Sequence, residues 1–279
     1  MWQATRIELF KIFRKPRTYI SFGAIAAIVL LIQMALYSDG ETYLRFALQA
    51  LQDSFVIEGT ILNGYFVCFI VLQTLLVHVP LLIALVAGDV VAGEAAMGTL
   101  RLLLTKPHHR SVLLLSKYAA SAVYTLLLLG FMALLSLVVS MAVFGTGDLF
   151  IMKSTEVVIL DGSDVLWRYV AALGFAALSM LTVAALAFFL SVFADNSIGP
   201  IIATMSIVIL FTILTTMDIP FFNVLKPYLF TNHMLNWKGF FEQPVDYSEI
   251  GKSAGILLLH IMALVGGAVF VFNKKDILS

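Results

Sequence analysis

The sequence has 279 residues, of which 61% are hydrophobic and only 12% are charged, and its formal net charge is zero. An average soluble domain has roughly a quarter charged residues. This chain therefore has too few charges to cover a water-facing surface, which excludes a soluble enzyme. Its apolar runs are long and continuous, and a backbone in hydrocarbon must satisfy its own hydrogen bonds. The composition thus predicts an all-α, polytopic membrane protein.

Residues 1–17 form the first predicted element, an amphipathic helix that lies in the membrane interface. On a helical wheel Trp2, Leu9 and Phe13 share one apolar stripe. The charged residues on the opposite side are Glu8, Lys11, Arg14 and Lys15. Such a helix places its apolar face in lipid and its basic face toward anionic headgroups. Pro16 should then bend the chain into the first membrane span.

Six apolar stretches are long enough to cross a bilayer, which takes about 20 residues per helix. They are Thr18–Leu36, Ile61–Ala87, Val112–Phe144, Val165–Phe193, Ile198–Met217 and Ser253–Phe272. An even number of spans places both termini on one side of the membrane. Of the lysines and arginines, eleven fall on that side and six on the other. Because positive charge marks cytoplasmic loops, we expect a plasma or inner membrane protein with both termini in the cytoplasm.

The cytoplasmic loop at residues 89–111 has the pattern of a short amphipathic helix. Glu94 is expected near its start, where a carboxylate suits the positive end of the helix dipole. Pro107 should end the helix. The apolar face consists of Leu100, Leu103 and Leu104, and the basic rim of Arg101, Lys106 and Arg110. Such a helix suits either of two roles, lying on lipid or docking into a groove on a soluble partner.

This loop resembles the E-x-x-x-G-T-L-x-x-L-L-x-x-P-x-x-R-x-x-x-x-x-x-K pattern of ABC-2 type transporter permeases. The matching residues are Glu94, Gly98, Thr99, Leu100, Leu103, Leu104, Pro107, Arg110 and Lys117. Weaker similarities cover most of the chain: the amphipathic start resembles that family's connecting helix, and Phe272–Ile277 resembles its basic terminus.

The resemblance implies the permease subunit of an ABC exporter, which pairs with a second permease copy, identical or not. Each permease of that family docks a separate ATPase subunit, so ATP and Mg²⁺ would be bound by that partner and this chain would carry no cofactor or catalytic site. Gly93–Lys106 would be the coupling helix. The implied ATPase interface consists of Glu94, Gly98, Thr99, Leu100, Arg101, Leu103, Leu104, Lys106, Pro107 and Arg110. The implied partners are proteins and the lipid bilayer, with no nucleic acid.

The segment at residues 218–252 is rich in proline and aromatic residues, which favour the membrane interface. It resembles the short helices that the permease family places between its fifth and sixth spans. We expect short extracellular helices that dip into the outer headgroup layer and partly cap the pathway. A solvated hairpin is the second interpretation.

Two other classes of protein remain open. A secondary transporter or channel would need ion-coupling acids, broken helices at mid-membrane or an internal repeat, and Gly199-Pro200 is the one candidate break. A membrane enzyme would need a catalytic constellation, and none can be named. His78 and His260 lie in apolar runs and are functional candidates, although a neutral histidine that donates to a neighbouring carbonyl is at least as common. The residues do not identify the transported substrate.

Overall fold

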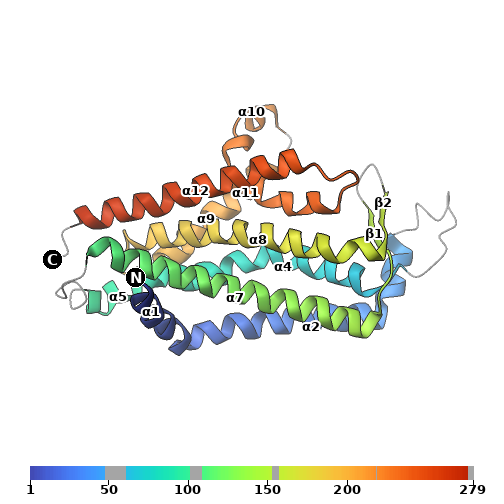
Figure 1. The fold of residues 1–279 in the computed structure, drawn as a ribbon, viewed down its shortest axis with the longest axis horizontal. Coiled ribbons are helices and arrows are strands. Elements are labelled where there is room, and N and C mark those ends of the chain that lie inside the picture. The colour runs from blue at the N-terminus through green and yellow to red at the C-terminus, as the bar shows by residue number, and fades with distance from the viewer. Residues whose placement is uncertain (48–60, 101–108, 153–156, 218, 276–279) are drawn as a thin grey trace.

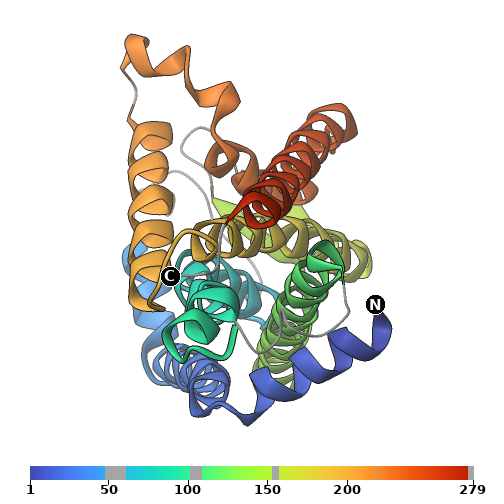
Figure 2. The same cartoon turned by 90° about the vertical axis from the view of Figure 1, so that its left-hand side faces the viewer.

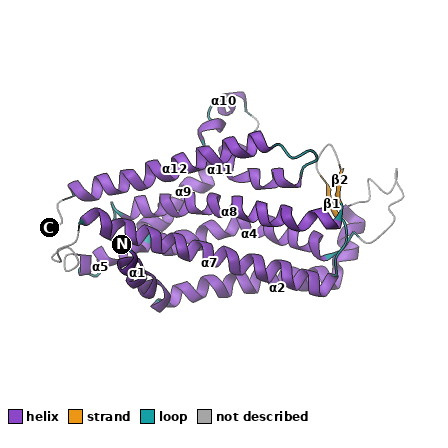
Figure 3. Ribbon diagram, in the orientation of Figure 1, coloured by secondary structure: helices purple, strands orange, loops and turns teal. Residues whose placement is uncertain are grey.

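The computed structural model describes residues 1–47, 61–100, 109–152, 157–217 and 219–275, and most of them are helical (Figures 1 and 3). The long helices run side by side in an elongated bundle (Figure 1). They are α2 (Pro16–Ala47), α4 (Gly64–Ala87), α7 (Arg110–Phe144), α8 (Gly162–Ser191), α9 (Ile198–Thr216) and α12 (Tyr247–Lys274). The shorter elements are α1 (Trp2–Arg14), α5 (Asp89–Ala96), β1 (Leu149–Met152), β2 (Val157–Leu160), α10 (Pro220–Asn223), η1 (Lys226–Tyr228), α11 (Phe230–Met234) and η2 (Leu235–Phe241).

Five of the described helices are long and apolar enough to cross a membrane: α2, α7, α8, α9 and α12. The predicted spans that correspond to them are confirmed in position, and α2 and α12 extend several residues beyond the apolar runs. The start of α1 and the last turn of α12 lie at the same end of the bundle, which we call the terminal end (Figure 1). The opposite end carries β1 and β2, and we call it the hairpin end.

The remaining predicted span corresponds to α4, which is bent. Its two arms, Gly64–Leu75 and His78–Ala87, meet at an angle of 51°. Pro80 lies within the second arm. A proline inside a helix removes one backbone hydrogen bond and its ring clashes with the preceding turn. Pro80 therefore explains the bend, which the sequence analysis did not anticipate. The candidate break at Gly199-Pro200 lies in the first turn of α9, where proline is tolerated, and α9 continues through it.

The core lies between α2, α4, α7 and α8. Side chains such as Val71, Leu75, Leu128 and Val183 are fully buried there. Large apolar side chains also cover the outside of the bundle. Examples are Leu134 of α7, Val170 of α8, Ile198 of α9 and Met262 of α12. A bundle that is apolar inside and outside is suited to lipid, because only hydrocarbon removes the penalty of exposing such a surface.

An antiparallel hairpin closes the far end of the bundle and was not predicted. Strands β1 and β2 pair from Leu149 opposite Leu160 to Met152 opposite Val157. The side chain of Asn63 caps α4 by accepting from the Phe66 amide and donates to the Asp148 carbonyl, 2.7 Å away. Because β-branched residues fit a pleated half-buried surface, the Val-Val-Ile-Leu run pairs as a strand rather than extending α8.

The short helices predicted between the fifth and sixth spans are present as α10, η1, α11 and η2. Of these, α11 and η2 pack against α8 and α12, whereas α10 contacts α9 and η1, and η1 contacts α11. Phe230 is buried between Phe211 of α9 and His260 of α12. Arg168 of α8 donates to the carbonyls of Phe240 and Glu242, at 2.8 and 3.0 Å, and so fixes η2.

A buried polar contact joins α11 to α12. His233 Nε2 lies 2.9 Å from the Pro227 carbonyl and therefore donates to it. Its Nδ1 is then free to accept from the Ser253 hydroxyl at 2.9 Å, while Asn236 donates to the same hydroxyl. His78 and His260 likewise donate to carbonyls one turn earlier, those of Thr74 and Ile256. Each of these histidines thus has a structural partner.

Candidate functional site

The most polar buried region of the described chain lies at the terminal end, where α1 crosses the bundle (Figure 2). Helix α1 ends at Arg14, Lys15 is extended, and Pro16 begins α2. Proline at the first helical position is tolerated because its missing N–H would have no partner there. The predicted bend at Pro16 is therefore confirmed, and it turns α1 across the ends of α5 and α7.

The predicted loop helix is divided. Helix α5 begins at Asp89 and ends at Ala96, so Asp89 and not Glu94 occupies the first turn. A turn follows at Met97 and Gly98, and Thr99 and Leu100 are helical again. Gly98 has a φ of 69°, a left-handed conformation that glycine adopts without the penalty of a Cβ atom. The Thr99 hydroxyl donates to the Glu94 carbonyl at 3.3 Å and supports this turn.

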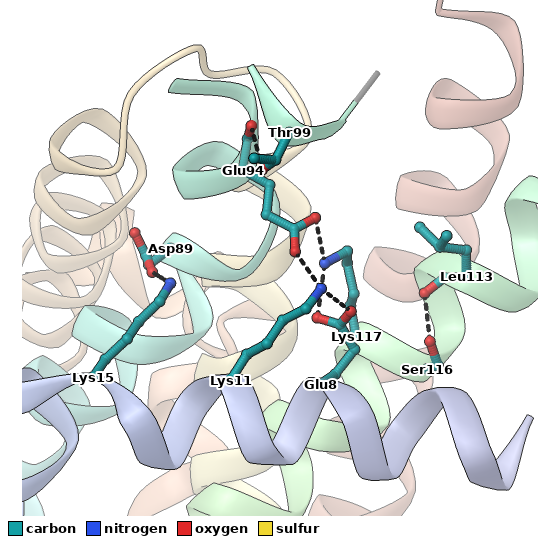
Figure 4. A network of polar contacts seen from close by, with 9 residues as sticks. All are labelled: Glu8, Lys11, Lys15, Asp89, Glu94, Thr99, Leu113, Ser116 and Lys117. Carbon is teal, nitrogen blue, oxygen red and sulfur yellow. Dashed lines mark hydrogen bonds and ion pairs between the residues drawn. The ribbon is translucent and has the colours of Figure 1, made fainter. Parts of the chain in front are cut away.

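Four charged side chains from three helices meet in a closed cluster, which we call the ionic square (Figure 4). Glu8 and Lys11 come from α1, Glu94 from α5 and Lys117 from α7. The Lys11 ammonium lies 2.7 Å from Glu8 and 2.8 Å from Glu94. The Lys117 ammonium lies 2.8 Å from Glu8 and 2.7 Å from Glu94. Each charge therefore has two partners of opposite sign, and the square is neutral.

The square is deeply buried on one side. Lys117 has a side-chain exposure of 0% and both glutamates 8%, whereas Lys11 reaches 36%. Burial alone would raise the pKa of the Glu8 carboxyl, but Lys117 and Lys11 outweigh it and hold that pKa below its usual value. Burial would likewise lower the pKa of Lys11, yet its hydrogen bonds to Glu8 and Glu94 raise it. These contacts therefore stabilise Glu8 as a carboxylate and Lys11 as an ammonium ion.

A second ionic contact lies beside the square. The Asp89 carboxylate of α5 forms ion pairs with Lys15 Nζ at 2.5 Å and with Arg17 Nη1 at 2.8 Å. The hydroxyl of Ser197 donates a hydrogen bond to the same carboxylate. Ser197 is the residue that precedes α9. A Cβ atom on Gly93 would overlap Asp89 Oδ1, so any larger residue there would have to displace this carboxylate from its partners. Asp89 thus links the corner between α1 and α2 to the start of α9.

The described residues of the predicted interface occupy four positions in the structure. Glu94 belongs to the ionic square, and Gly98 and Thr99 form the turn. Leu100 is only 7% exposed and packs in an apolar cluster with Leu114, Phe188 and Phe272, so it anchors the turn to α7, α8 and α12. Arg110 begins α7 and donates to the Lys275 carbonyl at 3.2 Å. Arg101, Leu103, Leu104, Lys106 and Pro107 lie outside the described residues.

The orientation of α1 differs from the sequence expectation. Glu8, Lys11 and Lys15 face the protein and are paired there, whereas Trp2 and Phe10 are exposed. Leu9 and Phe13 pack against the core. A helical wheel ranks residues by polarity and cannot anticipate that acids and bases 83 or 109 residues apart will neutralise one another. Glu8, Lys11 and Asp89 are therefore functional candidates that the sequence analysis did not identify.

Met97 is a further candidate. It lies at the tip of the turn and is 62% exposed, although its neighbours Glu94 and Leu100 are buried. The described part of the chain contains no group of three metal-ligating side chains. The arrangement instead joins the turn to four helices, because α1, α2, α5 and α7 each contribute a side chain to one of the two ionic contacts, and Ser197, which precedes α9, bonds to Asp89.

The bundle, its apolar exterior and the buried charges at one end define a multi-pass α-helical membrane protein. The chain belongs to the family described as protein of unknown function (DUF2705), whose match covers residues 24–278. That range includes Asp89, Glu94 and Lys117 but not Glu8 or Lys11. A comparison with curated proteins found no match.

Proposed function

We propose that this chain is the membrane-embedded permease subunit of an ABC exporter, with six spans and both termini in the cytoplasm. In this proposal α4 counts as the bent sixth span. A second permease copy and separate ATPase subunits complete the transporter, and ATP is hydrolysed by those partners. The turn at Met97–Thr99 contacts the ATPase.

The ionic square is the observation that carries this proposal. Glu94 and Lys117 open and close the sequence motif that resembles ABC-2 permeases, and their side chains form a direct ion pair. A motif that holds a surface turn rigidly against α1 and α7 suits the transfer of motion from a docked partner. The exposed Met97 adds an apolar contact at the tip, since methionine adapts its shape to a partner surface.

The test is capture of the ATPase from native membranes. Substitution Met97→Glu places a charge on the exposed tip without touching the ionic square, so the protein should fold but lose the co-purifying ATPase. Met152→Glu is the matched control, because Met152 is an exposed methionine at the hairpin end. It should retain the ATPase and its substrate-stimulated hydrolysis.

Absence of any ATPase from the wild-type preparation, or equal capture by both variants, would contradict the proposal. Met97→Glu should also elute as wild type in size-exclusion chromatography, which separates loss of docking from loss of fold.

The bend in α4 favours a second candidate, a secondary transporter. Broken helices at mid-membrane form the binding sites of many such proteins. Gln73 and Thr74 lie next to the 51° bend and line a cavity of about 320 Å³ between α2, α4 and β1. Transport that persists in ATP-depleted vesicles under an ion gradient would support this candidate and exclude the first.

A further inference from the structure

A second cavity, which shares Gln73 of α4 with the first, lies between α8 and the segment formed by α11 and η2. Its volume is about 190 Å³. Buried side chains form its floor, and exposed ones form its rim. The floor consists of Ala176, Ser179, Met180 and Trp237, and the rim of Gln73, Leu235 and Lys238, with Met234 between them.

Lys238 distinguishes this cavity from a packing defect. Its ammonium group lies over the Trp237 ring, 5.8 Å from the centroid, and it forms no ion pair with the described residues. The surrounding protein lowers the pKa of Lys238 by partial burial. Lys238 thus lies beside an aromatic wall, and no carboxylate of the described residues pairs with it.

The size of the cavity limits the ligand. An engineered apolar cavity of about 150 Å³ binds benzene, so this one accommodates a single ring system or a short branched chain. A phospholipid with two acyl chains is too large. Methionine sulfur packs favourably against aromatic rings, and Met180 and Met234 both line the cavity.

We propose that this cavity binds a small amphiphilic monoanion, with its apolar body between Met180 and Trp237 and its carboxylate or sulfonate on Lys238. The Gln73 amide is placed on the same rim and can donate to the anion. The site is independent of the proposed ATPase coupling, because the residues that form it lie in α4, α8, α11 and η2 and none belongs to the ionic square.

Binding of 2-naphthoate to the full chain in phosphatidylcholine nanodiscs tests the proposal, measured by calorimetry after subtraction of empty nanodiscs. The wild type should bind saturably. Lys238→Gln should weaken binding about tenfold or more, since a charge-assisted hydrogen bond is lost, and Lys238→Arg should retain it. The uncharged 2-naphthamide should bind weakly to the wild type and to Lys238→Gln alike.

Two controls make the result specific. Lys252→Gln removes another exposed lysine outside the cavity and should leave 2-naphthoate affinity unchanged. Ala176→Leu fills the floor and should abolish binding of both probes without changing the charge. Equal affinity of the wild type and Lys238→Gln for 2-naphthoate, or no saturable binding by the wild type, would overturn the proposal.

Discussion

Lys117 is a fully buried lysine whose two partners are both carboxylates. Removing one member of a buried ionic cluster leaves uncompensated charge in a low-dielectric region, which costs about 3–5 kcal/mol. We therefore predict that Lys117→Met lowers the stability of the purified protein by about that amount, measured as thermal unfolding in detergent. Glu8 and Glu94 would then share Lys11 alone.

The double variant Lys117→Met/Glu94→Gln is the matched control. It removes one charge of each sign and leaves the Glu8–Lys11 pair intact, so it should recover part of the lost stability. A single Lys117→Met variant that is as stable as the surface substitution Lys252→Met would show that the ionic square contributes nothing to the stability of the protein.

The Asp89 carboxylate packs against Gly93 and leaves no room for a side chain there. An alanine there would place its Cβ atom 2.3 Å from Asp89 Oδ1, and overpacking of this kind costs about 1–3 kcal/mol. Gly93→Ala should therefore displace Asp89 from Arg17 and Ser197 and lower the unfolding temperature. Gly174→Ala, at a helical glycine with no neighbouring atom within 4 Å, should leave stability unchanged or raise it slightly. A destabilised Gly174→Ala with an unaffected Gly93→Ala would contradict this interpretation.

At the scale of single elements, η2 depends on Arg168. The guanidinium donates to two η2 carbonyls and pairs with Asp164 at 2.7 Å. Lysine cannot reproduce this fork of donors. We predict that Arg168→Lys increases amide hydrogen exchange across residues 235–242 while α8 remains protected, and that Lys226→Gln does not. Unchanged exchange in η2 would mean that its apolar contacts suffice.

The long helices could be predicted from the sequence because each apolar run is itself the signal that a bilayer-spanning helix requires. The β1–β2 hairpin could not, since its two four-residue apolar strands are too short to give a clear signal between the spans predicted to end at Phe144 and to begin at Val165. The bend in α4 was detectable in principle from Pro80. The face of α1 was not, because its charges are neutralised by Glu94 and Lys117, which only the folded chain brings near.

The candidate site could be predicted only in part, because its contacts form between residues that are far apart in the sequence. The motif that begins at Glu94 pointed to the region in which the ionic square lies, but the pattern carried no information on what each residue contacts. Gly98 owes its identity to a left-handed turn and Leu100 to an apolar cluster. Neither role follows from spacing along a helix.

For the whole molecule, the charges of Glu8 and Lys11 on α1 make the stability of the fold depend on pH. The pKa of the Glu8 carboxyl is lower in the folded protein than its ordinary value of 4.5, so the unfolded state binds this proton more readily. The stability that Glu8 contributes is therefore present above pH 4.5 and lost as the pH falls through the folded pKa. Lys11 has the opposite sign, because its folded pKa is raised above 10.5. Its contribution is present below that pH and lost on further alkalinisation.

We expect the unfolding temperature of the wild type to change least with pH between about 4.5 and 10.5, and to fall outside that range. Glu8→Gln should lose the acidic part of this dependence and Lys11→Met the basic part. Identical pH profiles for the wild type and both variants would exclude a role of α1 in the transition.

The orientation in the membrane can be measured with single cysteines. Cys68 is buried, with 1% exposure, and Cys68→Ala provides the background. Met97→Cys at the terminal end should react with a membrane-impermeant thiol reagent only in inside-out vesicles, and Met152→Cys at the hairpin end only in right-side-out cells. The reverse pattern would place both termini outside the cell and exclude contact of the turn with a cytosolic ATPase.

The extended backbone at Lys15 separates α1 from α2, while the side chain of Lys15 is bound to Asp89. In the proposed coupling role, motion of the tip at Met97 would reach α1, the first turns of α7 and the residue before α9 together, because ion pairs and a hydrogen bond join these three distant stretches of sequence to α5.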